Sequence, residues 1–395
     1  MPAIRLRSGH DARLRHGHLW VFSNEILDDV STLPAGGVVE VLDASGRFLG
    51  RGLSNPNSLI SVRVCTRDVQ DDLDSVDFYV KRIEAALDLR RRALPGRSSC
   101  RVFAGEADGL PGLILDRYED IVAVQISALG LELRRPLLQE AIQRVLAPAG
   151  VVLRNEAGAR ALEGLPAERG VWWGEVPERV IFPAGFLPNG QPLRLYADVL
   201  GGQKTGFFFD QAENRAYGWR CSPGRRVLDV YANTGGWCVG ALASGAIEAT
   251  AIESNAETCQ ILQDNAALND RGPVTVLAED ARDALSRLQG ARFDLVFLDP
   301  PAFAKTRKKT PVALKAYREI NRLALGALAP GGLLFTSSCS YHIFEDRFEA
   351  EVLAAAHEAR RRLRQVRRGE QAPDHPVLPG HPETRYLKHL VYQAL

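Results

Sequence analysis

The chain has 395 residues, of which 46% are hydrophobic and 25% are charged, and its formal net charge is +1. This length predicts two or three domains, with ample apolar material for their cores. The near-neutral charge excludes a global attraction to nucleic acid, so any such affinity has to come from local basic patches.

The N-terminal segment, residues 1–22, has basic side chains but lacks the apolar stretch of a signal peptide. No uncharged apolar run in the chain is long enough to span a bilayer. Six cysteines occur without a CxxC pair, which argues against a zinc ribbon or a disulfide framework and fits a reducing compartment. We therefore expect a cytoplasmic protein with no membrane segment and no metal.

Residues 1–68 predict a small β-rich module. Two alternating runs around Ala-Ser-Gly in residues 38–52 indicate a hairpin, and residues 58–66 alternate again. An acidic stretch, residues 68–74, is typical of a linker, and residues 78–94 show helical spacing of apolar positions.

A second module follows, and we place it at residues 74–188. Asp-Gly and Pro-Gly pairs punctuate strand-like runs, and a helix is predicted around residues 137–146. These features predict a small α+β domain. A Gly/Pro-rich passage, residues 183–192, predicts its boundary with a third domain at residues 193–395.

The third domain alternates strand-like and helical segments. Helices are predicted at residues 237–244, 256–269 and 313–328. Five apolar runs predict strands at residues 225–232, 248–254, 273–279, 293–299 and 331–338. Such alternation predicts an α/β, Rossmann-like fold with a mostly parallel, doubly wound sheet.

The first three strand ends of this domain have the pattern of a nucleoside site. VLDVYANTGG at 227–236 enters a glycine turn, where Gly235 and Gly236 let backbone approach a ligand at a helix N-terminus. Acidic residues at the ends of successive strands (Asp229, Glu253 and Asp280, the last beside Ala281) are suited to ribose hydroxyls and an adenine edge.

The last two strands end in FDLVFLDPPAF at 293–303 and LLFTSSCSY at 333–341. Carboxyl ends of strands are where ligands bind in such sheets, so Asp299 and Cys339 should lie at one crevice. The prolines make the loop after Asp299 rigid, and that loop can present its carboxylate to a planar base beside Phe303. Cys339 stands out from the other cysteines because it follows an apolar strand and is flanked by two serines.

A thiol beside a carboxylate fits methylation of a pyrimidine at carbon 5. That carbon becomes reactive only after a thiolate adds to carbon 6, which is covalent catalysis. The thiol must be partly ionised, and this requires electropositive neighbours. The basic residues after the Asp-Pro-Pro turn could supply them: Lys305, Arg307, Lys308 and Lys309.

Over its full length the chain resembles the S-adenosylmethionine-dependent large-subunit ribosomal RNA cytosine methyltransferases that carry an N-terminal PUA domain. HGHLWVFSNEI at 16–26 and FLGRGLSNPNSLISVRV at 48–64 are similar to the PUA module. AGEADGLPGLILDRY at 104–118 is similar to the central domain, and DHPVLPGHPETRYLKHLVY at 374–392 to the family's ending. LDVYANTGGW, AIESN, AEDA, LDPPAF and SSCSYH follow in the family's order.

The resemblance implies a 5-methylcytidine-forming enzyme with Cys339 as nucleophile and Asp299 holding the cytosine edge. GGQKTGFFFDQAENR at 201–215 resembles the segment that lines the methionine side of the cofactor. The S-adenosylmethionine residues implied in full are Lys204, Thr205, Phe208, Asp210, Gln211, Asp229, Tyr231, Gly235, Gly236, Glu253, Ser254, Asp280, Ala281 and Asp299. The implied partner is large-subunit ribosomal RNA or its precursor particle, and relatives suggest a homodimer.

Ala302 departs from the pattern of many RNA cytosine methyltransferases, which have a second cysteine beside the Asp-Pro-Pro proline. The base that removes the carbon-5 proton is therefore left open, with His342 as one candidate. Two other interpretations remain. One is methylation of an exocyclic amine of adenine or guanine, which Asp-Pro-Pro-aromatic also suits and which needs no thiol. The other is a non-enzymatic RNA-binding protein.

Two groups of arginines are candidates for phosphate contacts. The first consists of Arg90, Arg91, Arg92, Arg97 and Arg101. The second consists of residues 360–362 with Arg364, Arg367 and Arg368, and its interleaved glutamates favour a solvated helix face. A target base in structured RNA has to be splayed out before carbon 6 can be attacked.

Overall fold

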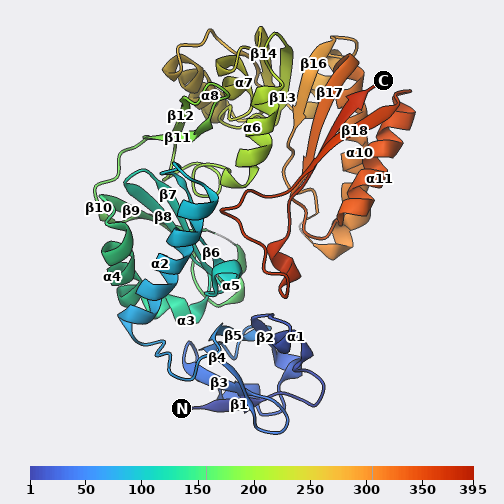
Figure 1. The fold of residues 1–395 in the computed structure, drawn as a ribbon. Helices are drawn as coiled ribbons and strands as arrows, with labels where there is room; N and C mark the ends of the chain where they lie inside the picture. The colour runs from blue at the N-terminus through green and yellow to red at the C-terminus, as the bar shows by residue number, and fades with distance from the viewer. Residues whose placement is uncertain (157, 305) are drawn as a thin grey trace. The chain divides into compact units, whose positions relative to one another are not determined.

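The computed structural model describes residues 1–156, 158–304 and 306–395 (Figure 1). The chain forms two compact units. The first unit comprises Met1–Val180, Ala197–Phe209 and Pro373–Thr384, and the second comprises Ile181–Tyr196, Asp210–Ala372 and Arg385–Leu395. Because the chain passes between the units several times, short segments far apart in sequence belong to one unit.

The first unit begins with a five-stranded sheet in the order β1-β3-β4-β5-β2. Its strands are β1 (Ala3–Arg5), β2 (Trp20–Phe22), β3 (Val38–Leu42), β4 (Phe48–Ser54) and β5 (Ile60–Thr66). The predicted hairpin is confirmed as β3 and β4, which pair antiparallel. Its turn is held by the Asp43 carboxylate, which accepts hydrogen bonds from the backbone N–H groups of Ser45 and Arg47. A short helix, α1 (Ala12–Arg15), joins the first two strands.

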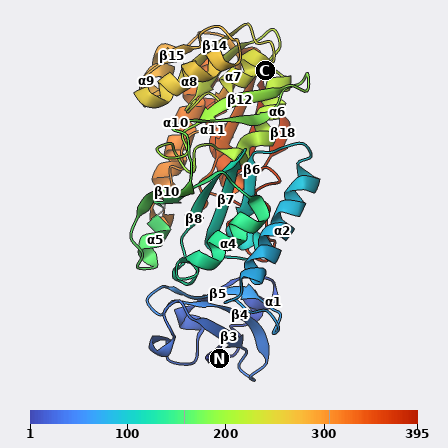
Figure 2. The same ribbon diagram turned by 90° about the vertical axis from the view of Figure 1, so that its left-hand side faces the viewer.

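The rest of the first unit is a second five-stranded sheet, ordered β10-β9-β8-β7-β6, with helices packed on it. Its strands are β6 (Cys100–Ala104), β7 (Leu113–Tyr118), β8 (Ile121–Ile126), β9 (Gly150–Asn155) and β10 (Glu168–Gly174). The helices are α2 (Val76–Ala93), α3 (Leu129–Glu132), α4 (Arg135–Leu146) and α5 (Gly158–Leu162). The long helices α2 and α4 pack against each other and close one apolar core with the sheet (Figure 2). Both agree with the helices predicted from the sequence.

The second unit contains a seven-stranded sheet in the order β15-β14-β13-β16-β17-β19-β18. Its strands are β13 (Arg226–Val230), β14 (Glu248–Ile252), β15 (Thr275–Leu277), β16 (Phe293–Leu298), β17 (Leu328–Ser338), β18 (Leu363–Gly369) and β19 (Lys388–Ala394). The first five are parallel, and β19 and β18 add antiparallel at one edge. The predicted parallel, doubly wound sheet is therefore confirmed. Its strand order reverses between β13 and β16, which is where such sheets bind ligands.

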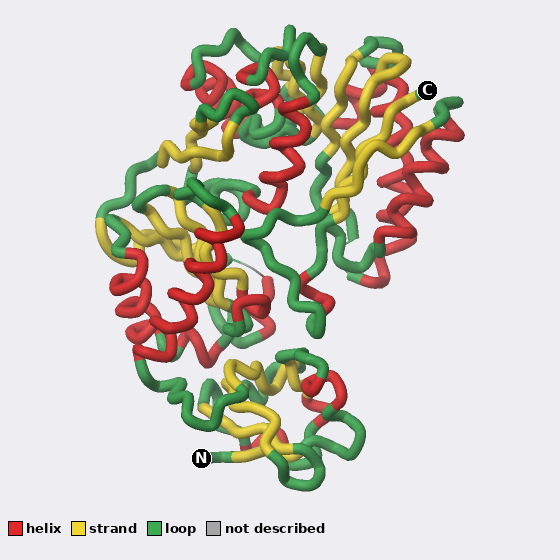
Figure 3. Tube along the Cα trace, viewed as in Figure 1, coloured by secondary structure: helices red, strands yellow, loops and turns green. Residues whose placement is uncertain are grey.

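Helices alternate with these strands (Figure 3). They are α6 (Ala212–Arg220), α7 (Cys238–Ala243), α8 (Ala256–Leu268), α9 (Ala281–Arg287), α10 (Thr310–Ala327) and α11 (Glu345–Glu358). Side chains of α9, α10 and α11 share an apolar core with one face of the sheet. The Gly/Pro-rich passage expected as a boundary lies in a β-hairpin, β11 (Val180–Phe186) with β12 (Pro192–Ala197).

Candidate active site

The segments that end the fourth and fifth parallel strands, β16 and β17, lie side by side. Strands β16 and β17 are neighbours in register, with Leu298 opposite Thr336, so the loops that follow them leave the same edge of the sheet. These loops are also joined directly, because the backbone N–H of Ala304 donates to Ser340 Oγ at 3.2 Å. The structure therefore brings the segments of Asp299 and Cys339 together, as the sequence predicted.

The carboxyl group of Asp299, at this edge of the sheet, has a raised pKa. Gln211 Nε2 donates to its Oδ1 at 2.9 Å, and Trp237 Nε1 lies 3.5 Å from its Oδ2. The side chain is mostly buried, and this burial, reinforced by the nearby charge of Asp210, raises the pKa of Asp299 to about 6. Near neutral pH such a carboxyl can therefore either accept or donate a hydrogen bond.

A chain of neutral polar groups fixes the amide that holds Asp299. Gln211 Nε2 also donates to Ser337 Oγ at 3.0 Å, and this hydroxyl lies 2.8 Å from His389 Nδ1. His389 is buried and stacks on Trp237 with the ring planes at 17°. Burial lowers the pKa of His389 to about 3, so the imidazole is neutral at physiological pH. The sequence alone had not identified Ser337, Trp237 or His389 as parts of this site.

Cys339 differs from most other cysteines in its surroundings. Four of the six are buried, and only Cys221 and Cys339 keep partial exposure; all six lie in the described part of the chain. Burial raises the pKa of each of the other five thiols. The flanking Ser338 and Ser340 are fully buried, and Ser340 Oγ lies 2.9 Å from the Tyr317 hydroxyl. The turn is thus anchored by its serines while the thiol between them stays accessible.

A lysine that sequence reasoning missed lies beside this turn. Lys388 begins β19, pairs with Ser338 of β17, and is 7% exposed. Its Nζ donates to the backbone carbonyls of Ser340 and Tyr386 at 2.7 and 2.8 Å. Burial lowers the pKa of Lys388 to about 8, while the Cys339 and Glu345 charges act in the opposite direction. A single lysine at the start of the apolar run HLVY was the only signal in the sequence.

The turn after β13 is the glycine turn for which the sequence predicted cofactor binding. Tyr231, Asn233 and Gly235 all have positive φ, at 64°, 48° and 85°. The Glu253 carboxylate at the end of β14 accepts hydrogen bonds from the backbone N–H groups of Asn233 and Asn255, both at 3.0 Å. The acidic side chain therefore ties the turn to the neighbouring strand and remains partly exposed.

Asp229 is fully buried beneath this turn. Its Oδ2 accepts a hydrogen bond from the Cys238 backbone N–H at 3.0 Å, at the start of α7. Its Oδ1, like Thr234 Oγ1, has no hydrogen-bond partner among the described residues. Burial, with smaller contributions from Asp299 and Glu253, raises the pKa of Asp229 to about 7. One oxygen of the buried Asp229 carboxyl group therefore lacks a donor among the described residues.

The third strand end is more exposed. Asp280 caps α9, where its side chain accepts from the Arg282 backbone N–H at 2.8 Å, and Ser254 is exposed beside Glu253. Ala281 is buried and its methyl group belongs to the sheet core, so its backbone is the part that could face a ligand. Gly236 is buried within the turn after β13.

The segment 201–211, which the resemblance assigned to cofactor binding, spans both units. In the first unit, Thr205 Oγ1 donates to Asp116 Oδ2 at 2.5 Å and is fully buried, and Lys204 Nζ lies 4.1 Å from the centre of the Phe208 ring. In the second unit, Asp210 Oδ2 accepts from the Tyr386 hydroxyl at 2.7 Å. The roles of these residues in cofactor binding stay predictions.

The predicted arginine cluster in residues 90–101 is wrong for two of its members. Arg90 is 2% exposed, and its guanidinium forms two hydrogen bonds to the Asp108 carboxylate at 2.6 and 2.7 Å. Arg101 makes the same kind of pair with Asp116, at 2.8 and 2.9 Å. Both guanidinium groups are paired with carboxylates inside the first unit, so they cannot contact phosphate.

The structure describes three of the four basic residues that follow the Asp-Pro-Pro turn. Lys305 lies outside the described residues, and Arg307, Lys308 and Lys309 are exposed. In the second arginine group, Arg368 pairs with Glu345 and Glu349. The group is solvated as expected, but the expected helix face is wrong, because Arg364, Arg367 and Arg368 lie on strand β18.

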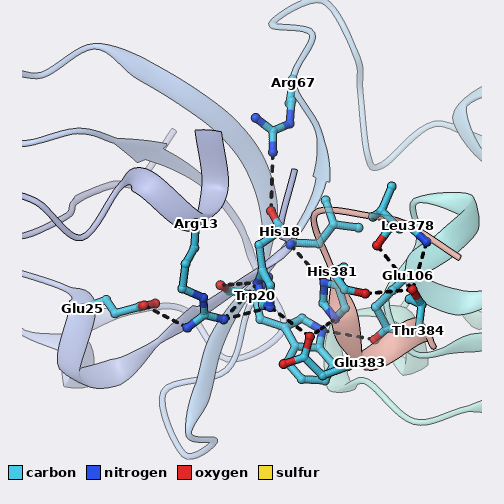
Figure 4. A network of polar contacts seen from close by, with 11 residues as sticks. Arg13, His18, Trp20, Glu25, Arg67, Glu106, Leu378, His381, Glu383 and Thr384 are labelled. Atoms are coloured by element: carbon cyan, nitrogen blue, oxygen red, sulfur yellow. Dashed lines mark hydrogen bonds and ion pairs between the residues drawn. The ribbon is translucent and has the colours of Figure 1, made fainter. Parts of the chain in front are cut away.

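Two histidines and a glutamate in the first unit have the residue types of a metal site (Figure 4). Glu383 Oε2 lies 3.4 Å from His18 Nε2 and 3.6 Å from His381 Nε2. The two imidazole rings are stacked, however, with centroids 4.0 Å apart and planes at 17°, so their lone pairs run side by side instead of converging. Arg13 Nη2, 2.8 Å from His18 Nε2, would also repel a cation. The geometry favours a polar contact that holds Pro373–Thr384 on the N-terminal sheet.

Among the described residues, no helix combines the length and the apolar character that a membrane span requires.

Two protein families match the chain. The model of a PUA-like domain matches residues 4–67, and that of an S-adenosylmethionine-dependent methyltransferase matches residues 185–392. The second match covers more than half of the 395 residues.

Curated relatives match over nearly the whole length. The ribosomal RNA large subunit methyltransferase I of Shewanella denitrificans is 36% identical over 395 residues, which cover 98% of each chain. The protein of the same name from Aeromonas hydrophila is 35% identical over 398 residues and 99% of each chain. Among solved structures, a methyltransferase complexed with SAH has a TM-score of 0.83 at 19% identity and full coverage of both chains, which shows a shared fold.

Proposed function

Because this chain belongs to the family of S-adenosylmethionine-dependent large-subunit ribosomal RNA methyltransferases, we propose that it methylates carbon 5 of a cytidine through a covalent adduct on Cys339. The observation that carries the proposal is an accessible thiol on a rigid turn, joined by a hydrogen bond to the loop that follows Asp299. A cytosine held by the carboxyl group would have its ring next to the sulfur.

The thiolate of Cys339 supplies the electrons that carbon 5 lacks. It adds to carbon 6 of the ring, and carbon 5 of the enamine so formed would take the methyl group from the sulfonium of bound S-adenosylmethionine, whose sulfur leaves as a neutral thioether. Loss of the carbon-5 proton then restores the double bond and expels the thiolate. The anchored serines on either side keep the sulfur in one place during both steps, which lowers the entropic cost of attack.

Asp299 is suited to hold the cytosine edge. With a pKa of about 6, its carboxyl group is protonated often enough near neutral pH to donate to the ring nitrogen while its other oxygen accepts from the exocyclic amino group. A hydrogen bond from the protonated carboxyl group to the ring nitrogen draws electrons from carbon 6 and so favours addition of the thiolate. Gln211 fixes the orientation of the carboxyl group.

The residues at the first three strand ends fit S-adenosylmethionine, the methyl donor of the family. Glu253 and Asp280 offer acceptors for ribose hydroxyls and the adenine amino group. The unpartnered oxygens of Asp229 and Thr234 call for donors, and the ammonium of the cofactor would provide them. Bound S-adenosylmethionine supplies the electrophilic methyl group.

Within this proposal the PUA-like domain binds the ribosomal RNA and the reaction takes place in the cytoplasm. The exposed Arg91 and Arg92 remain candidates for phosphate contacts in the first unit.

The test is to incubate the protein with large-subunit ribosomal RNA and S-adenosylmethionine labelled in the methyl group, then digest the RNA to nucleosides. We expect the label in 5-methylcytidine, and Cys339→Ala should abolish it while Cys221→Ala, the other partly exposed cysteine, retains it. Label in an N-methylated purine, with full turnover in Cys339→Ala, would establish the exocyclic amine as the target and refute the covalent mechanism.

A further inference from the structure

The buried ammonium of Lys388 has no carboxylate partner among the described residues. It is 7% exposed and forms no ion pair with any described carboxylate; its two hydrogen bonds go to backbone carbonyls. Burying an ammonium group in this way is unfavourable unless a charge compensates it. A lysine kept in such a place needs a role that an apolar residue of the same size could not fill.

The position of Lys388 points at one anion. In the ladder of β17 and β19 it lies opposite Ser338, and its Nζ binds the carbonyl of Ser340. Cys339 is the residue between these two. The third N–H bond of the ammonium is not used by any described group, and the cysteine sulfur interacts electrostatically with Lys388.

We propose that the Lys388 ammonium stabilises the thiolate of Cys339 and thereby sets the ionisation of the nucleophile. This inference rests on the role given to Cys339 in the proposed function and adds a positioning residue to it. It replaces the exposed basic residues after the Asp-Pro-Pro turn as the source of the electropositive field.

Other charged and titratable groups near Lys388 do not take this role. The charge of Glu345 of α11 also raises the pKa of Lys388, but its carboxylate is already paired with Arg368. Tyr317 of α10 has a raised pKa because it is buried, so it stays neutral, and its hydroxyl is engaged by Ser340. Cys339 lies between Ser338 and Ser340, both of which Lys388 contacts, so its sulfur is the anion that fits the ammonium.

The proton count of the reaction leaves Lys388 unchanged. The thiol proton of Cys339 leaves to solvent, and the sulfur–carbon 6 bond forms from the resulting thiolate. When carbon 5 loses its proton after methyl transfer, the sulfur–carbon 6 bond breaks and its electrons return to sulfur. The thiolate again faces an ammonium that has neither gained nor lost a proton.

The experiment measures the ionisation of Cys339 without RNA or cofactor. The rate of iodoacetamide alkylation at Cys339 is followed by mass spectrometry between pH 6 and pH 10 in the full-length protein and in Lys388→Met, which keeps an unbranched side chain one atom shorter and removes its charge. We expect the midpoint of the rate profile to rise by about one pH unit in Lys388→Met, which makes alkylation near pH 7.5 about tenfold slower. Lys388→Arg should restore most of the rate.

Two matched variants separate this local effect from a general loss of charge. Lys315→Met, on the exposed side of α10, and Lys308→Met, after the Asp-Pro-Pro turn, should leave the profile of Cys339 unchanged. If Lys388→Met does not fold, which thermal melting reveals, Lys388→Gln takes its place. An unchanged profile in the folded variant, an Arg variant as slow as the Met variant, or an equal shift in either control would overturn the proposal.

The result is independent of the methylated product. If 5-methylcytidine is not formed, the proposed function fails, but the alkylation profile still shows whether Lys388 controls the thiol. If methylation requires Cys339 and the profile does not depend on Lys388, the further inference alone fails.

Discussion

Replacing Asp229 by Asn should stabilise the cofactor-free protein more at pH 8 than at pH 5. Burial raises the pKa of this carboxyl from 3.8 in the unfolded chain to about 7. A raised pKa means that the folded state binds the proton more tightly, so the stabilisation is complete below pH 3.8 and is lost as pH rises through 7. Above that pH the protein carries a buried charge whose Oδ1 has no described partner.

The size of the effect follows from the two pKa values. When the pH rises from 5 to 8, ionisation of Asp229 should lower the free energy of unfolding by about 2.5 kcal/mol. Asn does not ionise and should avoid this loss. For a unit of this size the gain corresponds to a rise of about 5–10 °C in melting temperature at pH 8 relative to pH 5. The amide oxygen of Asn can still accept the Cys238 N–H, so this hydrogen bond cancels in the comparison.

The assay is thermal melting of Asp229→Asn and the unchanged protein at both pH values, without cofactor. Asp283→Asn, which removes an exposed carboxylate from α9, is the control and should show no pH-dependent difference. If Asp229→Asn changes the melting temperature equally at pH 5 and pH 8, the carboxyl is not ionising in this range and the reasoning is refuted. The same variant should bind S-adenosylmethionine more weakly, because the cofactor ammonium loses its charged acceptor.

Two further changes test the supports of the site and of the first unit. Gln211→Leu removes the amide that links Asp299 to Ser337 and should lower kcat about 10- to 100-fold with a small change in KM for the cofactor, measured by steady-state methylation; an unchanged kcat would contradict the positioning role. Asp108→Ala leaves the Arg90 guanidinium buried without its carboxylate and should cost about 3–5 kcal/mol in urea unfolding of the first unit, whereas a loss below about 1 kcal/mol would show that the pair is dispensable.

The sheet could be predicted where a strand is a run of apolar residues. The central parallel strands β13 and β16 are buried at nearly every position, so most of their residues must be apolar and the pattern is strong. Edge strand β18 reads LRQVRRG and is mostly solvent-exposed, so it carries no such signal. β18 was therefore missed as a strand. β19 is almost fully buried and overlaps the family's ending at 374–392, but it was not predicted as a strand either.

Only those site residues that follow parallel strands could be predicted from the sequence. Asp299 and Cys339 follow neighbouring parallel strands, and the rule that such ends share one edge was sufficient to place them. Lys388 arrives from an antiparallel strand about fifty residues later in the chain, and no local pattern indicates that its partner is the strand of Cys339.

The error over the arginine cluster has a different physical origin. A run of arginines was interpreted by its charge alone, whereas α2 has a buried face with a helical period. Arg90 follows Ile83 and Leu87 at spacings of seven and three, so it lies on that face and must bury its guanidinium against a carboxylate. The helical spacing was present in the sequence and could have separated Arg90 from Arg91 and Arg92.

Trapping of a covalent complex tests the central claim most directly. An RNA substrate with 5-fluorocytidine has no carbon-5 proton to lose, so after methyl transfer the sulfur–carbon 6 bond cannot break. We predict a complex that survives denaturing electrophoresis, requires S-adenosylmethionine, and maps to Cys339 by mass spectrometry. It should persist in Cys221→Ala and vanish in Cys339→Ala. An enzyme that methylates cytidine without a trapped complex, or one trapped on another residue, would contradict the account.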